Sequence, residues 1–381
     1  MKTDKELIDY FVKTRNIKKT TKRGYEVYIK EYSDYFGMSM VELLQEAEDE
    51  EERGIRWKHR TLKKRLLDYR AYVYNKHAVT TAKNRFVKIL AFYRHFDIEI
   101  HQLPAYNLRN TEVQKPLIFE DLLTKDIIRD ALDICKPVMK PTILFMASSG
   151  CARTETRNLT IMDYIEATQD YHNGGNIYQV IDTLMDYDNV IPTFNILRVK
   201  TNKYYTTFCT PETVKAINNY LLSRPEELTP DKQLFKLGES YFAHQFININ
   251  NQLHLGKVGK HNRFRSHNLR KYNASILMND GMSRELVNDL QGRAKPKTEQ
   301  SYFANNKETL KEEYIKHIPA LTIMNDVQKV TIKSPEYQLL ETQNRELQNE
   351  NQGLKRDVQA LFDRMDQLEK GVTWEDVQKE Y

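Results

Sequence analysis

The sequence predicts a mainly α-helical protein with a smaller α+β part, arranged as folded domains followed by a C-terminal coiled coil. Three observations support this prediction. Apolar residues recur at helical spacing through residues 1–100. Segments rich in β-branched and aromatic residues are few and short. Leucines repeat every seven residues near the end of the chain. The 381 residues are enough for about two or three domains.

The composition excludes several classes of protein. Hydrophobic residues make up 40% of the chain, with 23 Tyr and 15 Phe, so extended disorder is not expected. No apolar run approaches the ~18 residues of a membrane helix, and the first residues are charged, unlike a signal peptide. The three cysteines have no metal-ligand spacing. We therefore expect a cytoplasmic protein that contacts no membrane and holds no cysteine-bound zinc.

The charge is modest overall, at +5, but it is unevenly distributed. Residues 42–52 are acidic, whereas residues 53–94 contain thirteen Lys or Arg and only one acid, Asp68. A second basic segment, 257–271, lies in a stretch without acids from 240 to 279. Solvated faces normally mix both signs, so these segments favour binding to double-stranded DNA over a merely solvated surface. A nucleoid-associated location would follow.

The pattern of elements divides the chain. Residues 1–105 predict a domain of four or five helices. Residues 106–116 are polar and without periodicity, and they predict a linker. Residues 117–330 predict a mixed domain in which two strands form a hairpin around Thr201 and Asn202. Its expected helices are 125–135, 138–149, 211–222, 266–278 and 283–291, and its expected strands are 177–181, 193–200 and 203–209.

The tail, 334–370, carries the clearest repeat. With the leucines at d, the a positions include two asparagines, which suit the seam of a self-associating pair better than a helix packed on the body. The chain is therefore expected to form a homo-oligomer or to bind an accessory protein through this segment. The d positions are Leu340, Leu347, Leu354, Leu361 and Leu368, and the a positions are Tyr337, Asn344, Asn351, Val358 and Met365.

One short motif lies in the second basic segment. His267-Asn268-Leu269-Arg270 is an HxxR sequence, and about one such match is expected by chance in a chain of this composition. Its significance comes from the residues downstream. Arg293 follows Arg270 by 23 residues, and Tyr302 follows Arg293 by nine.

Four segments, taken in order, resemble the tyrosine recombinase (phage integrase) family, in the style of archaeal or proviral integrases. They correspond to its first-arginine block, lysine hairpin, HxxR block and nucleophile block: 145–163, 200–203, 266–272 and 290–303. The ordered set is specific, whereas no single segment is. Over residues 1–320 the resemblance implies a helical core-binding domain (1–105), a catalytic domain (117–330) and tetramers assembled on DNA.

The resemblance also implies the chemistry. Tyr302 would attack a phosphodiester and form a covalent 3′-phosphotyrosine, while Arg153 and Arg270 hold the non-bridging oxygens. Lys200 would protonate the leaving 5′-oxygen, and His267 would assist proton transfer at Tyr302. No cofactor and no metal are implied. The candidate site residues are Arg153, Lys200, His267, Arg270, Arg293 and Tyr302.

The first block departs from the family pattern. The usual arginine position is Ala152, and Arg153 lies one residue later, with Arg157 as the alternative. We expect Glu155 to buttress an arginine of the site. Residues 165–193 are longer than the usual connection to the lysine block and have no assigned role.

Other positions keep alternatives. Lys203 is the alternative to Lys200 as the general acid. Arg293 stands where the family has His or Trp, and a guanidinium can still bind a phosphate oxygen, with Lys295 in reserve. Tyr314 competes with Tyr302 as nucleophile, but its spacing from Arg293 does not fit.

The sequence thus predicts a site-specific DNA recombinase or integrase, a tyrosine-type DNA strand transferase that integrates or excises a mobile element. Two alternatives remain. One is a catalytically decayed recombinase that only binds DNA, which the displaced arginine favours. The other is a type IB topoisomerase-like enzyme, which uses similar chemistry without a specific site.

Overall fold

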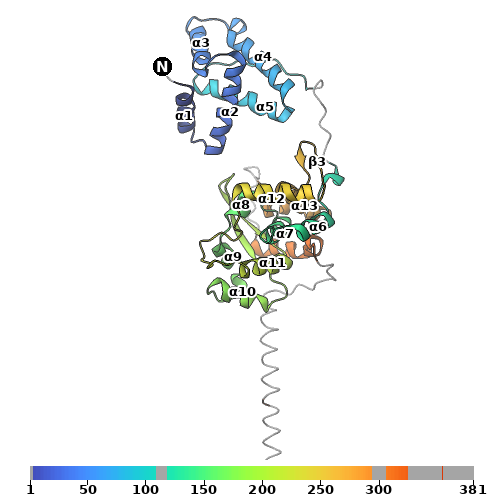
Figure 1. The fold of residues 1–381 in the computed structure, drawn as a ribbon. Coiled ribbons are helices and arrows are strands. Elements are labelled where there is room, and N and C mark those ends of the chain that lie inside the picture. The colour runs from blue at the N-terminus through green and yellow to red at the C-terminus, as the bar shows by residue number, and fades with distance from the viewer. Residues whose placement is uncertain (1–2, 109–117, 294–305, 325–353, 355–381) are drawn as a thin grey trace, which may run out of the picture. The chain divides into compact units, whose positions relative to one another are not determined.

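A computed structural model of the chain describes residues 3–108, 118–293 and 306–324, together with Leu354 (Figure 1). The chain divides into two compact units, Met1–Pro116 and Leu117–Tyr381. The predicted coiled coil, 334–370, lies outside the described residues except for Leu354. None of the helices within the described ranges is long and apolar enough to cross a membrane.

The first unit is helical, as the sequence predicted. Its five α-helices are α1 (Asp4–Thr14), α2 (Lys19–Phe36), α3 (Met40–Glu52), α4 (Thr61–Lys76) and α5 (Val79–His95), with a 3-10 turn, η1 (Trp57–His59). Thr3 and Ser39 begin α1 and α3 with capping boxes that satisfy the first N–H groups of each helix. Aromatic rings fill the core between the helices, and the rings of Tyr32 and Tyr69 meet edge to face at 4.7 Å.

Acidic residues of α3 bind the first turns of α4, which lies in the basic segment 53–94. Glu50 is nearly buried and accepts a hydrogen bond from the backbone N–H of Thr61 at 2.8 Å, at the beginning of α4. Glu46 forms a two-pronged ion pair with Arg65, at 2.7 and 2.9 Å. The acidic segment and the basic segment that follows it in the sequence therefore bind each other in the structure.

The second unit contains most of the helices and all the strands of the described residues. It is made of the helices α6 (Lys125–Ile134), α7 (Met139–Ser149), α8 (Arg153–Asn158), α9 (Ile161–Ala167), α10 (Ile177–Met185), α11 (Pro211–Leu222), α12 (Glu239–Gln252), α13 (Ser266–Asn279), α14 (Arg284–Leu290), α16 (Lys307–Lys316) and α17 (Ile318–Leu321), the strands β1 (Thr193–Arg198), β2 (Lys203–Phe208), β3 (Lys257–Val258) and β4 (His261–Asn262), and the 3-10 turns η3 (Phe119–Asp121) and η4 (Gln169–Tyr171).

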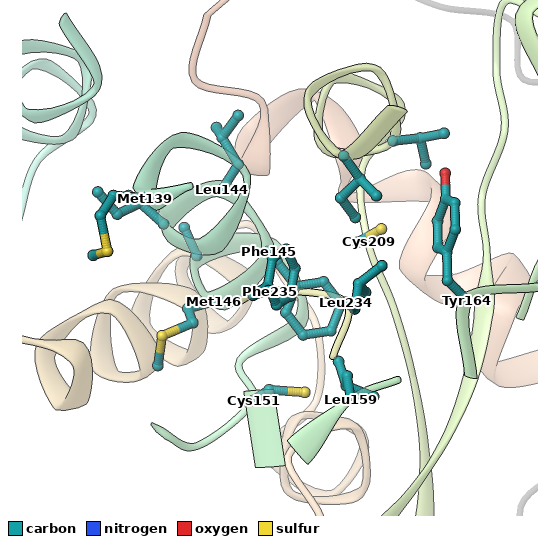
Figure 2. Packing of buried hydrophobic residues seen from close by; sticks show 14 of the residues in the cluster. Met139, Leu144, Phe145, Met146, Cys151, Leu159, Tyr164, Cys209, Leu234 and Phe235 are labelled. Atoms are coloured by element: carbon teal, nitrogen blue, oxygen red, sulfur yellow. The ribbon is translucent and has the colours of Figure 1, made fainter. Parts of the chain in front are cut away.

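Helix α7 is the centre of this unit, because it is buried on every side and packs against α11 and α13. Figure 2 shows Phe145 of α7 beside Phe235 in the middle of the core, and their ring centroids are 5.6 Å apart. Phe194 of β1 contacts Phe145 from another side, at 5.1 Å. This packing fixes the end of α7, where Gly150 and Cys151 lead into α8.

Most of the expected elements are confirmed. The five helices expected beyond residue 117 are α6, α7, α11, α13 and α14. Strands β1 and β2 pair in antiparallel register, with Arg198 opposite Lys203, so the hairpin connection is the four residues 199–202 rather than the expected two. The left-handed backbone of Asn202 (φ 53°) closes the turn.

The strand expected at 177–181 is wrong, because this segment is the first part of α10. Asn176 caps the helix, with Gln179 completing a capping box. The buried residues Ile177, Val180, Ile181 and Leu184 then follow the spacing of one helix face. β-branched composition favoured a strand, but the cap and the helical spacing decide the structure. The long connection 165–193 thus contributes a helix to the core.

The last described elements are anchored to the same core. Asn306 caps α16 by accepting a hydrogen bond from the N–H of Glu308 at 3.1 Å. Tyr314 of α16 is fully buried and donates to the carbonyl of Ser148, at the end of α7, at 3.1 Å. Burial raises the pKa of Tyr314 well above its ordinary value. Tyr314 therefore packs in the core, with its hydroxyl bonded to the end of α7.

We predict that Gly150→Ala destabilises the second unit strongly. Gly150 has φ +67°, and a Cβ there would meet the amide oxygen of Asn273 and lie 2.8 Å from Nε2 of Gln291. Left-handed backbone and overpacking together should cost about 2–5 kcal/mol.

The matched control is Gly256→Ala, which has φ +66° but no atom within 4 Å of the added Cβ. It should cost only the backbone part, about 1–2 kcal/mol. Urea unfolding of both variants measures the difference, and equal losses would show that the contact with α13 is unimportant.

Candidate active site

The residue around which the site is built is Gln291, at the end of α14. Its side chain is completely buried, and its amide Nε2 donates to the carbonyl of Arg270 at 3.0 Å and to Oδ1 of Asn273 at 2.9 Å. Asn273 in turn donates to the carbonyls of Ala147 and Ser148, at 3.1 and 2.8 Å. These bonds satisfy carbonyls at the end of α7 and join α7, α13 and α14 at one point.

Arg270 of the HxxR motif lies at this junction. Its side chain is buried, at 6% exposure, and it donates to the carbonyl of Gly150 at 2.6 Å and to the carbonyl of Gln291 at 2.6 Å. Burial, followed by the positive charge of Arg198, lowers the pKa of Arg270 from its ordinary value. The guanidinium is thus held rigidly in a place that is costly for a charge.

Two more guanidiniums meet at Gln291. Arg198, the last residue of β1, donates to the same Gln291 carbonyl at 2.5 Å. Arg293 donates through Nε to Oε1 of Gln291 at 3.0 Å. Burial, then the charge of Arg198, lowers the pKa of Arg293. Arg198 was not among the residues predicted from the sequence. In the sequence, Arg198 was marked only by its position in an expected strand, two residues before Lys200.

His267 is exposed at the start of α13, next to this group. Burial of part of the ring, followed by the charges of Lys271, Arg265, Arg270 and Arg293, lowers its pKa below the ordinary value of 6.5. A lowered pKa favours the neutral form of the imidazole, which is the form that can accept a proton. His267, Arg270 and Arg293 thus lie near one another in the structure.

Arg153 and Arg157 both interact with Glu239. Ala152 caps α8, and Arg153, exposed at the first helical position, forms an ion pair with Glu239 of α12 at 2.9 Å. Arg157 approaches the other oxygen of Glu239 at 4.0 Å and donates to the carbonyl of Leu237. No contact within the described parts of the chain joins either arginine to Arg270.

Glu155 does not hold an arginine directly. Its Oε2 accepts from the N–H of Ala152 at 2.9 Å and from the hydroxyl of Tyr205 at 2.8 Å. Its charge still acts on Arg270. Tyr205 also contacts the sulfur of Cys151 at 3.4 Å, and burial raises the pKa of Cys151 to about 11. Glu155 therefore supports the backbone before α8 and Tyr205 of β2, rather than bonding to an arginine as expected.

The remaining predicted residues are on or beyond the hairpin. Lys200 and Lys203 are both exposed, Lys200 in the turn and Lys203 at the start of β2. Tyr302 and Lys295 fall in 294–305, outside the described residues. No group of three or more His, Cys, Asp or Glu within the described ranges could hold a metal ion.

Comparison with known proteins was made by sequence and by structure. The chain matches no protein-family model and no curated protein. Among solved structures, its fold is that of a site-specific recombinase. The structure is similar to XerH site-specific recombinase in a post-cleavage complex with palindromic difH substrate, at 17% identity over 81% of this chain and 83% of that one, with a TM-score of 0.52. The fold expected from the sequence is thereby confirmed.

Two further solved structures are less similar. The pre-cleavage complex of XerH with difH has 17% identity over 82% of this chain and 84% of that one, with a TM-score of 0.49. The Tn1549 transposon integrase in complex with circular intermediate DNA has 15% identity over 83% of this chain and 100% of that one, with a TM-score of 0.48.

The lowered pKa of His267 predicts a specific pH dependence. Its folded-state pKa lies below the unfolded-state value of about 6.5. The unfolded chain therefore takes up the proton first, and the contribution of neutral His267 to stability is full above pH 6.5 and is lost as the pH falls. NMR titration of the ring should give a midpoint below 6.5, and added salt should raise it by screening the four cations. A midpoint above 6.5 would contradict this account.

Proposed function

We propose that this protein is a site-specific DNA recombinase or integrase that cuts and rejoins DNA through a covalent 3′-phosphotyrosine at Tyr302. The observation that carries the proposal is that Arg270 and Arg293 both donate to Gln291, with His267 near enough to feel both charges, in a fold shared with XerH. A buried guanidinium, that of Arg270, with the exposed Arg293 and an imidazole beside it suits a phosphodiester, because its oxygens accept from guanidiniums and its reaction needs a base.

The reaction balances within the residues of the chain. The hydroxyl oxygen of Tyr302 attacks phosphorus, the bond from phosphorus to the 5′-oxygen breaks, and a phosphotyrosine bond forms. The tyrosine proton passes to His267, and Lys200 supplies a proton to the departing 5′-oxygen. Arg270 stabilises the charge that grows on the non-bridging oxygens in the transition state. Rejoining reverses these steps, since the energy of the broken bond is kept in the new one.

DNA binding is supported by the basic residues that are exposed. In the first unit, acids of α2 and α3 neutralise some bases of the segment 53–94: Glu31 pairs with Lys76 and Arg85, and Glu46 and Glu51 pair with Arg65 and Arg60. Exposed bases remain to attract phosphates through counterion release. These are Arg53, Arg56, Lys58, Lys64, Lys83 and Arg94. In the second unit, Lys257 and Lys260 are exposed on the β3–β4 hairpin.

The proposal predicts a covalent adduct that depends on Tyr302. The substrate is a pool of duplexes with a randomised segment beside a nick, so that the short fragment released by cleavage dissociates and rejoining is blocked. The strand is labelled on its 5′ side, which stays with a 3′-phosphotyrosine. Wild-type protein should give a slowly migrating labelled band on a denaturing gel, and sequencing the bound DNA would identify the site.

Tyr302→Phe should give no band, and Tyr314→Phe, which removes one buried hydroxyl, should retain it. No adduct from wild type, with retained DNA binding on a native gel, would instead indicate a decayed recombinase. Relaxation of supercoiled plasmids without sequence preference would indicate a type IB topoisomerase-like enzyme.

We also propose that residues 334–370 form a coiled coil through which copies of the chain associate, supported by the heptad repeat of leucines. A chain ending at Val330 should then contain fewer copies per particle than the full chain, when the light-scattering mass is divided by the mass of each chain at the same concentration, while the adduct with Tyr302 still forms. An unchanged number of copies per particle would exclude the tail as the site of self-association.

A further inference from the structure

We propose that Arg198, at the end of β1, is a catalytic residue that binds the scissile phosphate together with Arg270. The inference deepens the proposed function and rests on it. The resemblance assigned this second guanidinium to Arg153 at the start of α8. In the structure it comes from the hairpin strand instead.

The first argument is geometric. Arg198 and Arg270 donate to one acceptor, the carbonyl of Gln291, at 2.5 and 2.6 Å, so their guanidiniums converge. A guanidinium has five N–H donors, and these bonds leave several unused on each residue. An anion that accepts from both residues would satisfy donors that the protein leaves open.

The second argument is electrostatic. The two guanidiniums share one acceptor oxygen, so their like charges are close together and repel each other. Because Arg270 is buried, the local dielectric constant is low and the repulsion is stronger. Within residues 3–108, 118–293 and 306–324, no carboxylate forms an ion pair with either arginine. Glu155 is the acid whose charge reaches Arg270, but the hydrogen bonds of its Oε2 go to Ala152 and Tyr205. The arrangement carries excess positive charge that a phosphate would neutralise.

The third argument concerns Arg153. Its guanidinium pairs with Glu239, and Arg157 approaches the same carboxylate, so both arginines at α8 have an anionic partner already. Ala152, at the usual arginine position, has no polar side chain. Arg198, in contrast, is close to another cation, Arg270, and donates to a neutral group, the carbonyl of Gln291. The strand that ends in Arg198 also leads directly into the turn that carries Lys200, so one hairpin would bring both groups to the phosphate.

The test compares three matched substitutions in the adduct assay: Arg198→Gln, Arg153→Gln and Arg129→Gln. Arg129 is the control, because its guanidinium also donates to a backbone carbonyl, that of Ile323 at 2.9 Å, but on α6. Arg198→Gln should slow adduct formation about 100- to 1,000-fold, as loss of a transition-state donor does, with DNA binding changed less than about threefold. Arg198→Lys, which keeps the charge without the planar fork, should lie between Gln and wild type.

Arg129→Gln should match wild type. Loss of the adduct in Arg153→Gln with retention in Arg198→Gln would overturn the inference. Thermal unfolding of each variant shows whether it is folded, and Arg198→Lys serves if Arg198→Gln is not.

A second measurement separates this inference from the proposed function. Inorganic phosphate at millimolar concentration, against chloride of equal ionic strength, should raise the unfolding temperature of wild type and of Arg129→Gln by binding the folded state. Arg198→Gln should lose that increase. If wild type forms no adduct but shows this phosphate effect, the recombinase proposal fails and the anion site stands. If phosphate stabilises Arg198→Gln as much as wild type, the site assigned to Arg198 is wrong, whatever the adduct assay gives.

Discussion

The main-chain carbonyl and side-chain amide of Gln291 hold the candidate site together. The carbonyl accepts from Arg198 and Arg270, the amide oxygen accepts from Arg293, and the amide nitrogen donates to α13. Close approach makes this possible. Gly150 and Gly292, on the two sides of the junction, both have left-handed backbone, and a Cβ on Gly292 would enter the ring of Tyr205. Strand β1 and helix α13 therefore both reach Gln291, at the end of α14, without a side chain in the way.

The distribution of ion pairs explains why positive charge collects at that point. In the first unit, Glu46, Glu50 and Glu51 fasten α4, and in the second unit Glu239 neutralises Arg153. These four acids thus hold helices or neutralise arginines elsewhere, and the described partners of the arginines around Gln291 are carbonyl and amide groups. A net charge of only +5 is compatible with a strongly cationic site because the imbalance is local.

Much of this could be predicted from the sequence, for physical reasons that differ from part to part. Helical spacing and local caps gave α6, α7, α11, α13 and α14, because these signals lie within a few residues of one another. The HxxR motif gave His267 and Arg270 for the same reason. The prediction for 177–181 is wrong because β-branched composition favours a strand, whereas the Asn176 cap and the helical spacing of the buried residues decide the structure. Arg198 could not be found, since its partner Gln291 is 93 residues away and only the fold brings them together.

The anchoring of α16 has a consequence for the proposed nucleophile. Tyr302 precedes Asn306, the cap of α16, by four residues, and α16 is bonded through Tyr314 to the end of α7. Four residues of extended chain span at most about 14 Å. Arg293, on the other side of Tyr302, is bonded to Gln291. By chain connectivity, Tyr302 is thus four residues from the cap of α16 and nine residues from Arg293. In the proposed reaction, these two short connections would set the local concentration of the phenol at the phosphate, an advantage that a nucleophile free in solution lacks.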